Sequence, residues 1–211
     1  MSPAPGIQKV IDRWQTIRNW FLFRGFDVKM AFPDGKKDGF VITDDEYSER
    51  IESGWELFYR PATDIVPYDA LMFILGQEFH WTINKGAQRF VAWYNIKNGY
   101  WFWYQVGDQN LHLGEGSHRE YVEKCGSKFV VTVKRIPLLE EYVIVWHLHK
   151  AVTGQEMDLK NWIWSATLFK KRNLDLKGES GYGINVGSMN AAACFENPPS
   201  DCGLRLVEVI S

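Results

Sequence analysis

The sequence predicts an α+β fold that is mainly β: an antiparallel β-sandwich or jelly-roll-like sheet with an N-terminal amphipathic helix packed on it. Three observations support this class. There is one amphipathic stripe near the N-terminus, short apolar runs bounded by turn residues recur along the rest of the chain, and 15% of the residues are aromatic. Aromatic and β-branched side chains favour half-buried strands.

The N-terminal helix is expected over residues 7–24. Its apolar side chains recur at spacings of three and four residues and fall on one face, while polar side chains such as Arg13 are assigned to the opposite side. The apolar stripe consists of Ile7, Val10, Ile11, Trp14, Ile17 and Phe21. Pro5 before the segment and Gly25 after it are typical helix boundaries.

Two short strands and a second helix are expected next. The strands cover residues 26–32 and 40–42. Thr43-Asp44-Asp45-Glu46 has the form of a capping box, which predicts a helix that begins there and ends near Ser53, before Gly54.

Beyond this helix the pattern is mostly β. A strand is expected at 55–59, and the apolar run 68–75 fits either a buried helix or a buried strand, because periodicity does not separate the two. The remaining strands are expected at 78–83, 88–96, 100–106, 128–136, 141–150, 162–169 and 204–210.

Length and charge narrow the class of protein. The 211 residues contain no linker, so we predict a single domain over 1–211, with a helix-containing part at 1–76 and a β-rich part at 77–211. The formal net charge of −2 argues against a nucleic-acid partner that depends on phosphate neutralisation. No run has the length of a membrane span, and the start lacks a signal-peptide pattern, so a soluble, cytoplasmic or intracellular protein is expected.

Asn98-Gly99 lies between two aromatic-rich runs and predicts a β-hairpin over 88–106. Counting from this turn sets Ile96 opposite Trp101 and Tyr94 opposite Trp103. One face then holds Ala92, Tyr94, Ile96, Trp101 and Trp103, and the other holds Val91, Trp93, Phe102, Tyr104 and Val106. Because both faces carry large rings, the second face needs a cover: the N-terminal helix, another subunit or a ligand.

This hairpin supplies the candidate binding site. Flat rings pack on the C–H faces of sugars, and neighbouring polar groups fix hydroxyls. The predicted ligand-binding residues are Tyr94, Trp101, Trp103, Gln105, Asp108 and Asn110. A small molecule or glycan is the expected ligand.

His147 and His149 form a candidate metal site. If residues 141–150 are a strand, both imidazoles share one face and can chelate Zn²⁺ or Fe²⁺ with a third ligand such as His112. The His-x-His pair resembles that of cupins, metal-binding double-stranded β-barrels, but the cupin glycines and glutamate are missing. No other cofactor is expected.

Cysteines and acidic pairs give weaker signals. The turn-rich loop between Cys194 and Cys202 allows a disulfide in an oxidising compartment and reduced thiols in the cytoplasm. Glu140-Glu141 fits an exposed turn.

Three functions follow from these observations. The first is a non-catalytic ligand-binding protein, with carbohydrate as the first class to test. The second is a self-assembling homo-oligomer, such as a viral coat or occlusion-type subunit. The third is a metal-dependent enzyme built on His147 and His149.

Overall fold

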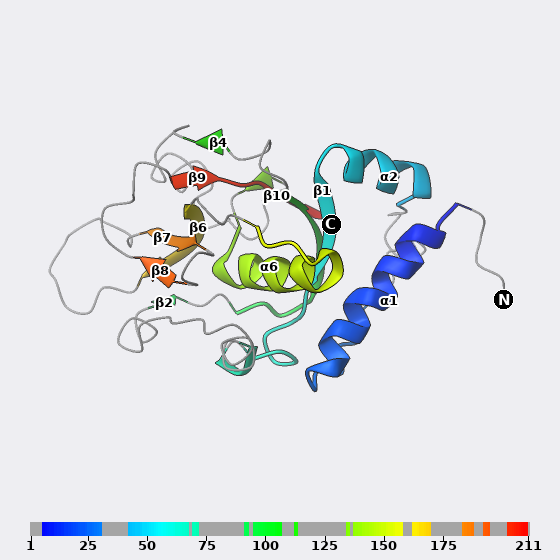
Figure 1. The fold of residues 1–211 in the computed structure, drawn as a ribbon. Coiled ribbons are helices and arrows are strands. Elements are labelled where there is room, and N and C mark those ends of the chain that lie inside the picture. Colours follow the sequence, from blue (N-terminus) through cyan, green and yellow to red (C-terminus); the bar gives the residue numbers. More distant parts are fainter. Residues whose placement is uncertain are drawn as a thin grey trace, which may run out of the picture.

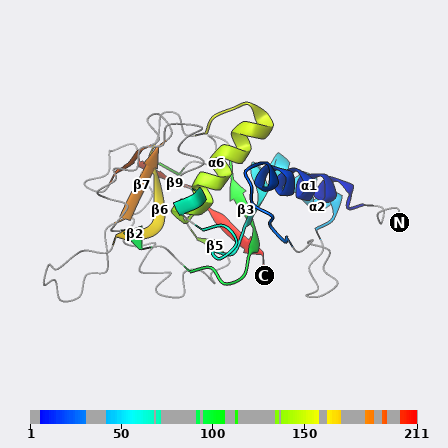
Figure 2. The same cartoon turned by 90° about the horizontal axis from the view of Figure 1, so that it is seen from below.

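The computed structural model describes residues 6–30, 42–67, 69–71, 91–92, 95–106, 112–113, 134–135, 137–157, 162–169, 183–187, 192–194 and 202–210. Within them, helices combine with two β-sheets, which confirms the α+β class. The central helix α6 (Leu139–Thr153) contacts strands of both sheets. Helices α1 (Gln8–Phe23) and α2 (Asp44–Glu52) lie on the far side of the first sheet from the second (Figures 1 and 2). The sandwich or jelly-roll form and the single-domain organisation stay predictions.

The first sheet has four antiparallel strands in the order β1-β3-β10-β5. They are β1 (Trp55–Arg60), β3 (Tyr100–Gln105), β10 (Val207–Ile210) and β5 (Lys134–Arg135). Trp55 pairs with Gln105, and the N–H of Val106 donates to the carbonyl of Gly54 at 2.7 Å. Hydrogen-bonded pairs alternate along an antiparallel ladder, so the backbone groups of Leu57 point away from β3, toward the outer edge of β1.

Helix α1 (Gln8–Phe23) confirms the N-terminal helix. Val10, Ile17 and Phe21 of the predicted stripe are buried, and each fully buried side chain of this size stabilises the fold by roughly 1.5–3 kcal/mol. Arg13 is buried too, although we had assigned it to the polar face.

Helix α2 (Asp44–Glu52) begins at the predicted capping residue. The hydroxyl of Thr43 accepts a hydrogen bond from the backbone N–H of Glu46 at 3.2 Å. The Asp44 carboxylate in turn accepts the N–H groups of Gln8 and Lys9 at 3.0 and 2.8 Å. Because the residue before α1 is Ile7, which has no polar side chain, α2 supplies the N-terminal cap of α1.

The segment after α1 differs from its prediction. Residues 26–30 alternate between buried and exposed, as a strand would, but they form no strand within the described part of the chain. The alternation of buried and exposed residues therefore comes from an extended segment that packs on the core but pairs with no strand among the described residues. Residues 69–71, within the run predicted as either helix or strand, are helical. The strand predicted at 40–42 lies mainly outside the described residues, and the strand predicted at 78–83 lies wholly outside them.

The strand predicted at 141–150 is wrong: these residues belong to helix α6 (Leu139–Thr153). Every residue from Leu139 to His149 is buried, so the helix has no polar face and its sequence lacks a period of 3.6. Gly154 ends it in the left-handed conformation, with φ of 74°, and its N–H donates to the carbonyl of Lys150 at 2.8 Å.

The predicted hairpin over 88–106 is also wrong. Strand β2 (Val91–Ala92) pairs with β6 (Trp162–Phe169) in the second sheet, whereas β3 pairs with β1 and β10 in the first. Ile96 instead exchanges hydrogen bonds with Thr63, through its N–H at 2.9 Å and its carbonyl at 2.8 Å. Asn98-Gly99 therefore turns the chain between two sheets.

The second sheet follows the order β4-β9-β6-β7-β8, with β2 also paired to β6. Its further strands are β4 (His112–Leu113), β7 (Gly183–Gly187), β8 (Ala192–Cys194) and β9 (Cys202–Leu204). The β6–β9 pair is parallel, and the other pairs are antiparallel. Cys194 in β8 and Cys202 in β9 are thus separated by β7 and β6.

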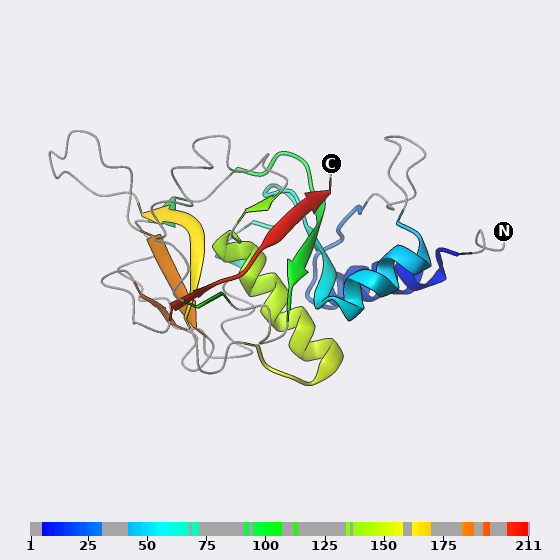
Figure 3. The same cartoon turned by 90° about the horizontal axis from the view of Figure 1, so that it is seen from above.

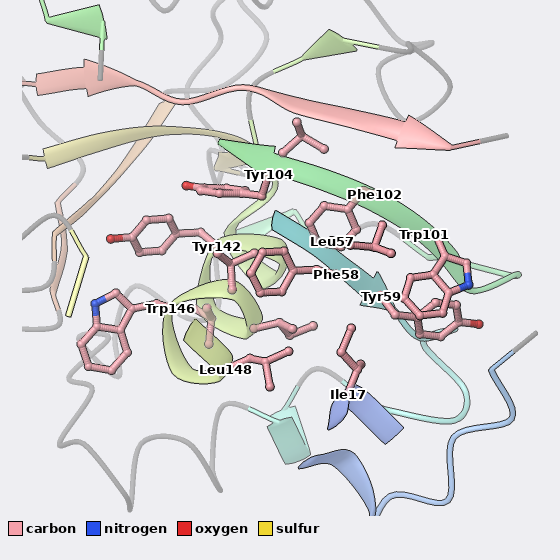
Figure 4. Packing of buried hydrophobic residues seen from close by; sticks show 14 of the residues in the cluster. Ile17, Leu57, Phe58, Tyr59, Trp101, Phe102, Tyr104, Tyr142, Trp146 and Leu148 are labelled. Carbon is pink, nitrogen blue, oxygen red and sulfur yellow. The ribbon is translucent and has the colours of Figure 1, made fainter. Parts of the chain in front are cut away.

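Helices cover both faces of the first sheet. The rings of Phe58, Phe102 and Tyr104 point toward Tyr142 and Trp146 of α6, while Leu57, Tyr59 and Trp101 lie on the other face (Figure 4). Figure 3 shows β10 and β3 lying over α6, with α2 beside the start of β1. The cover that the sequence left open is therefore protein. Helix α6 lies on the face of Phe58 and Phe102, α2 packs on the opposite face through the Tyr47–Trp103 contact, and α1 lies along the outer edge of β1, where Arg13 binds the carbonyl of Leu57.

Candidate functional site

The predicted aromatic platform lies in the core where its side chains are described. Trp101 and Trp103 are 7% and 1% exposed, and the Trp103 ring packs on Tyr47 of α2 with 5.8 Å between centroids. Gln105 is buried as well. The other three predicted residues, Tyr94, Asp108 and Asn110, lie outside the described part of the chain. Carbohydrate binding stays a prediction, and the two tryptophans are unavailable as its surface.

The two histidines do not share a face, because they lie on a helix. Successive residues rotate by 100° in a helix, so His147 and His149 point about 200° apart. Burial, with smaller contributions from the positive charges of Arg24 and Lys150, lowers the pKa of His147 to about 3. His112 lies in β4, opposite Leu204. Among the residues the structure describes, no three His, Cys, Asp or Glu side chains form a group that could hold a metal ion.

His149 instead belongs to a cluster that we call the Glu56 cluster: Arg13, Glu56 and His149. His149 Nδ1 lies 2.8 Å from Glu56 Oε1, and Arg13 Nη2 lies 3.2 Å from Glu56 Oε2. Arg13 Nε donates to the carbonyl of Leu57 at 2.8 Å, and its guanidinium stacks on the Phe58 ring at 4.8 Å. One carboxylate on β1 thus joins α1 to α6.

The charge of this carboxylate follows from its partners. Burial works to raise the pKa of Glu56, but the hydrogen bond from His149 and the charge of Arg13 together outweigh it, so the pKa lies below the usual 4.5. Glu56 is therefore ionised at neutral pH. Nearby, burial raises the pKa of Tyr47, while the charge of Arg13 opposes that shift.

A second group, the Glu141 cluster, consists of Tyr100, Arg135 and Glu141 at the start of α6. Glu141 accepts four hydrogen bonds: from Tyr100 at 2.6 Å, from Arg135 Nη1 and Nη2 at 2.6 and 2.5 Å, and from the N–H of Leu138 at 2.7 Å. Both Glu141 and Arg135 have fully buried side chains, so the exposed turn predicted here is wrong. Burial and the Glu141 charge place the pKa of Tyr100 well above 10.

The neighbouring pair, Arg60 and Glu140, is looser. Arg60 Nη2 lies 3.9 Å from Glu140 Oε1, and both side chains are fully buried. Arg60 Nη1 donates to the carbonyl of Pro61 at 2.6 Å. Burial raises the pKa of Glu140, while the charge of Arg60 opposes the shift. Together with the Glu141 cluster, this pair fixes the first turn of α6 against the sheet.

Sequence patterns carried partial signals of these clusters. Arg13 lies three residues after Val10 and four before Ile17, which puts it within the apolar stripe. Glu56 is a lone carboxylate in the aromatic strand Trp55–Arg60. His149 was singled out as a metal ligand, but its pairing with Glu56 was missed because the element containing it was taken for a strand.

Among the residues that the structure describes, the most exposed large apolar side chain lies at the C-terminal end of α1. Phe23 is 87% exposed and its neighbour Leu22 is 49% exposed. We call these two residues the α1 end. Every other large apolar side chain that is exposed in the described part of the chain is less exposed than Phe23.

Known proteins give no family for this chain. No protein-family model, curated protein or solved structure matches it. None of the helices in the described ranges has the length and apolar character needed to cross a membrane. Its function is therefore inferred from the arrangement of its own residues.

Proposed function

We propose that this chain is a self-associating protein whose copies meet through the α1 end. The observation that carries the proposal is the exposure of Phe23, at 87%, next to Leu22 on a well-packed helix. Single exposed apolar residues are common on soluble proteins, but adjacent large ones at one helix end favour a contact surface.

The α1 end is held rigidly, which favours its use as a contact. Phe21, directly before it, is fully buried, and the Arg24 guanidinium, directly after it, stacks on the Trp20 ring at 4.1 Å. A backbone that is already ordered loses little conformational freedom when a partner covers it. Burying Phe23 in a neighbouring copy would contribute about 1.5–3 kcal/mol, and a two-fold contact would count it twice.

The size of a stable interface shows what else the contact needs. Specific interfaces bury about 800 Å² on each partner, several times the area of two side chains. Phe23 and Leu22 would therefore form the apolar centre of a larger contact, whose rim is polar. The outer face of α1, with Gln15, Arg18 and Asn19 exposed, supplies such a rim.

Sedimentation velocity over a concentration series tests the proposal. The wild-type chain is expected to form a dimer or larger assembly, and the double variant Leu22→Ser/Phe23→Ser is expected to sediment as a monomer. Ile51→Ser is the matched control, because Ile51 is also exposed, at 40%, but lies on α2, the helix that Figure 1 shows next to α1.

The outcome is clear in either direction. A wild-type monomer throughout the series contradicts self-association. An assembly that the double variant leaves intact contradicts the assignment to the α1 end. Circular dichroism of each variant checks that the helices are retained.

A further inference from the structure

The Glu56 cluster holds one imidazole in a defined orientation and protonation pattern. An ionised carboxylate only accepts hydrogen bonds, so His149 must donate to Glu56 Oε1 through an Nδ1–H. In the neutral ring, Nε2 then carries a lone pair. No described residue hydrogen-bonds to Nε2, and the imidazole is 11% exposed.

The orienting carboxylate is itself fixed. Arg13 binds its second oxygen and is anchored by the carbonyl of Leu57 and the ring of Phe58. The imidazole therefore has an orienting partner on one nitrogen and an acceptor on the other. This arrangement characterises histidines whose ring is held in one orientation and whose second nitrogen accepts a hydrogen bond or a ligand.

We propose that His149 is the acceptor of a small-molecule site, in which its Nε2 receives a hydrogen bond from a hydroxyl or thiol group, with Glu56 and Arg13 as positioning residues. Among the described residues, no group of three His, Cys, Asp or Glu side chains includes His149, so a single hydrogen bond fits the geometry better than coordination. His147, on the same helix but 1% exposed, is a built-in comparison. This inference rests on different residues from the α1 end.

Two measurements on the full-length protein test it. Long-range ¹H–¹⁵N NMR spectra of the imidazoles report the tautomer directly, and His149 is expected to be protonated at Nδ1 near neutral pH. Diethyl pyrocarbonate then reports whether Nε2 is open: Nε2 attacks a carbonyl carbon, an N–C bond forms, and ethyl carbonate leaves with the Nδ1 proton. His149 is expected to react faster than His147, and glycerol, as the hydroxyl probe, is expected to slow that reaction.

Glu56→Gln separates positioning from simple packing. The amide keeps the shape but has one acceptor oxygen in place of two and lacks the charge, so it cannot accept from both Arg13 and His149. The reaction at His149 is therefore expected to slow by about tenfold while the fold is retained. The proposal is overturned if the wild-type tautomer is Nε2–H, if His149 reacts no faster than His147, or if glycerol gives no protection. The tautomer measurement needs no variant, so it decides the matter even if Glu56→Gln does not fold.

Discussion

Replacing Glu141 by leucine should destabilise the protein strongly, because the change strands a buried charge. The Arg135 side chain is fully buried, and both of its terminal nitrogens donate hydrogen bonds to Glu141, at 2.6 and 2.5 Å. Burial acts to lower the pKa of Arg135, but the charge and hydrogen bonds of Glu141 and Tyr100 raise it above the usual value, so the guanidinium stays charged. Glu141→Leu leaves that charge without its counter-ion.

The expected cost follows from the number of groups left unpaired. Removing one partner of a buried ion pair costs about 3–5 kcal/mol. The Tyr100 hydroxyl and the Leu138 N–H also lose their acceptor, but such costs overlap and are not added in full. With a urea dependence of about 2–3 kcal/mol per molar for a chain of this size, the unfolding midpoint should fall by about 1–2 M.

A second variant makes the test specific. Arg135→Met/Glu141→Leu removes both charges and should recover most of the lost stability, because apolar replacements of a whole buried pair are often neutral. Urea unfolding followed by tryptophan fluorescence measures both variants. A midpoint shift below about 0.3 M for Glu141→Leu, or a double variant no more stable than the single one, would show that this ion pair is not buried as described.

Three further predictions concern the core. A methyl group on Gly99 would lie 2.1 Å from the Tyr59 hydroxyl oxygen, so Gly99→Ala should lower stability by about 1–3 kcal/mol in thermal unfolding, and less in a Tyr59→Phe background. Trp103→Ala should lower the free energy of unfolding by about 3–5 kcal/mol, because the ring is buried. Unchanged stability would show that the Trp103 ring lies on the surface. The pKa of His147 is about 3 in the folded protein and 6.5 ordinarily. The contribution of the neutral, buried imidazole to the free energy of unfolding is therefore fully present above pH 6.5 and is lost as the pH falls toward 3, because the unfolded chain takes up the proton first. His147→Leu should therefore flatten the fall of the urea midpoint between these pH values, and an unchanged slope would contradict the burial of the imidazole.

Local signals predicted three elements. Thr43 and Glu46 marked the start of α2, the stripe containing Ile17 and Phe21 marked α1, and β6 was predicted with its bounds, Trp162–Phe169. These signals are capping residues and apolar periodicity, which can be read without knowing which segments the element packs against.

The errors occurred where long-range packing decides the structure. Val143, Ile144 and Val145 favour a strand by propensity, but the surrounding core outweighs that preference and buries them in a helix. The helix signals there were the acidic pair before the apolar run and Gly154 after it. The β1–β3 pairs join residues 40 to 50 positions apart, and the β3–β10 pairs join residues more than 100 positions apart, which no turn motif encodes.

The same difference between local signals and long-range packing explains which parts of the candidate site were predicted. The residue types were visible, since His149 was singled out, but its partners Glu56 and Arg13 come from other elements. A wrong secondary structure for one element therefore produced a wrong set of partners.

The hydrogen bond from Arg13 to the carbonyl of Leu57 has a consequence for how the protein behaves if α1 is lost. β1 ends the strand order of its sheet, and the outward-facing groups of an end strand can template a strand from another molecule. The guanidinium occupies one of these groups, and the helix carrying it lies along the strand. Proteolysis between α1 and α2 that releases the helix would thus expose a ready pairing edge, and the remaining fragment would be prone to assemble into β-aggregates.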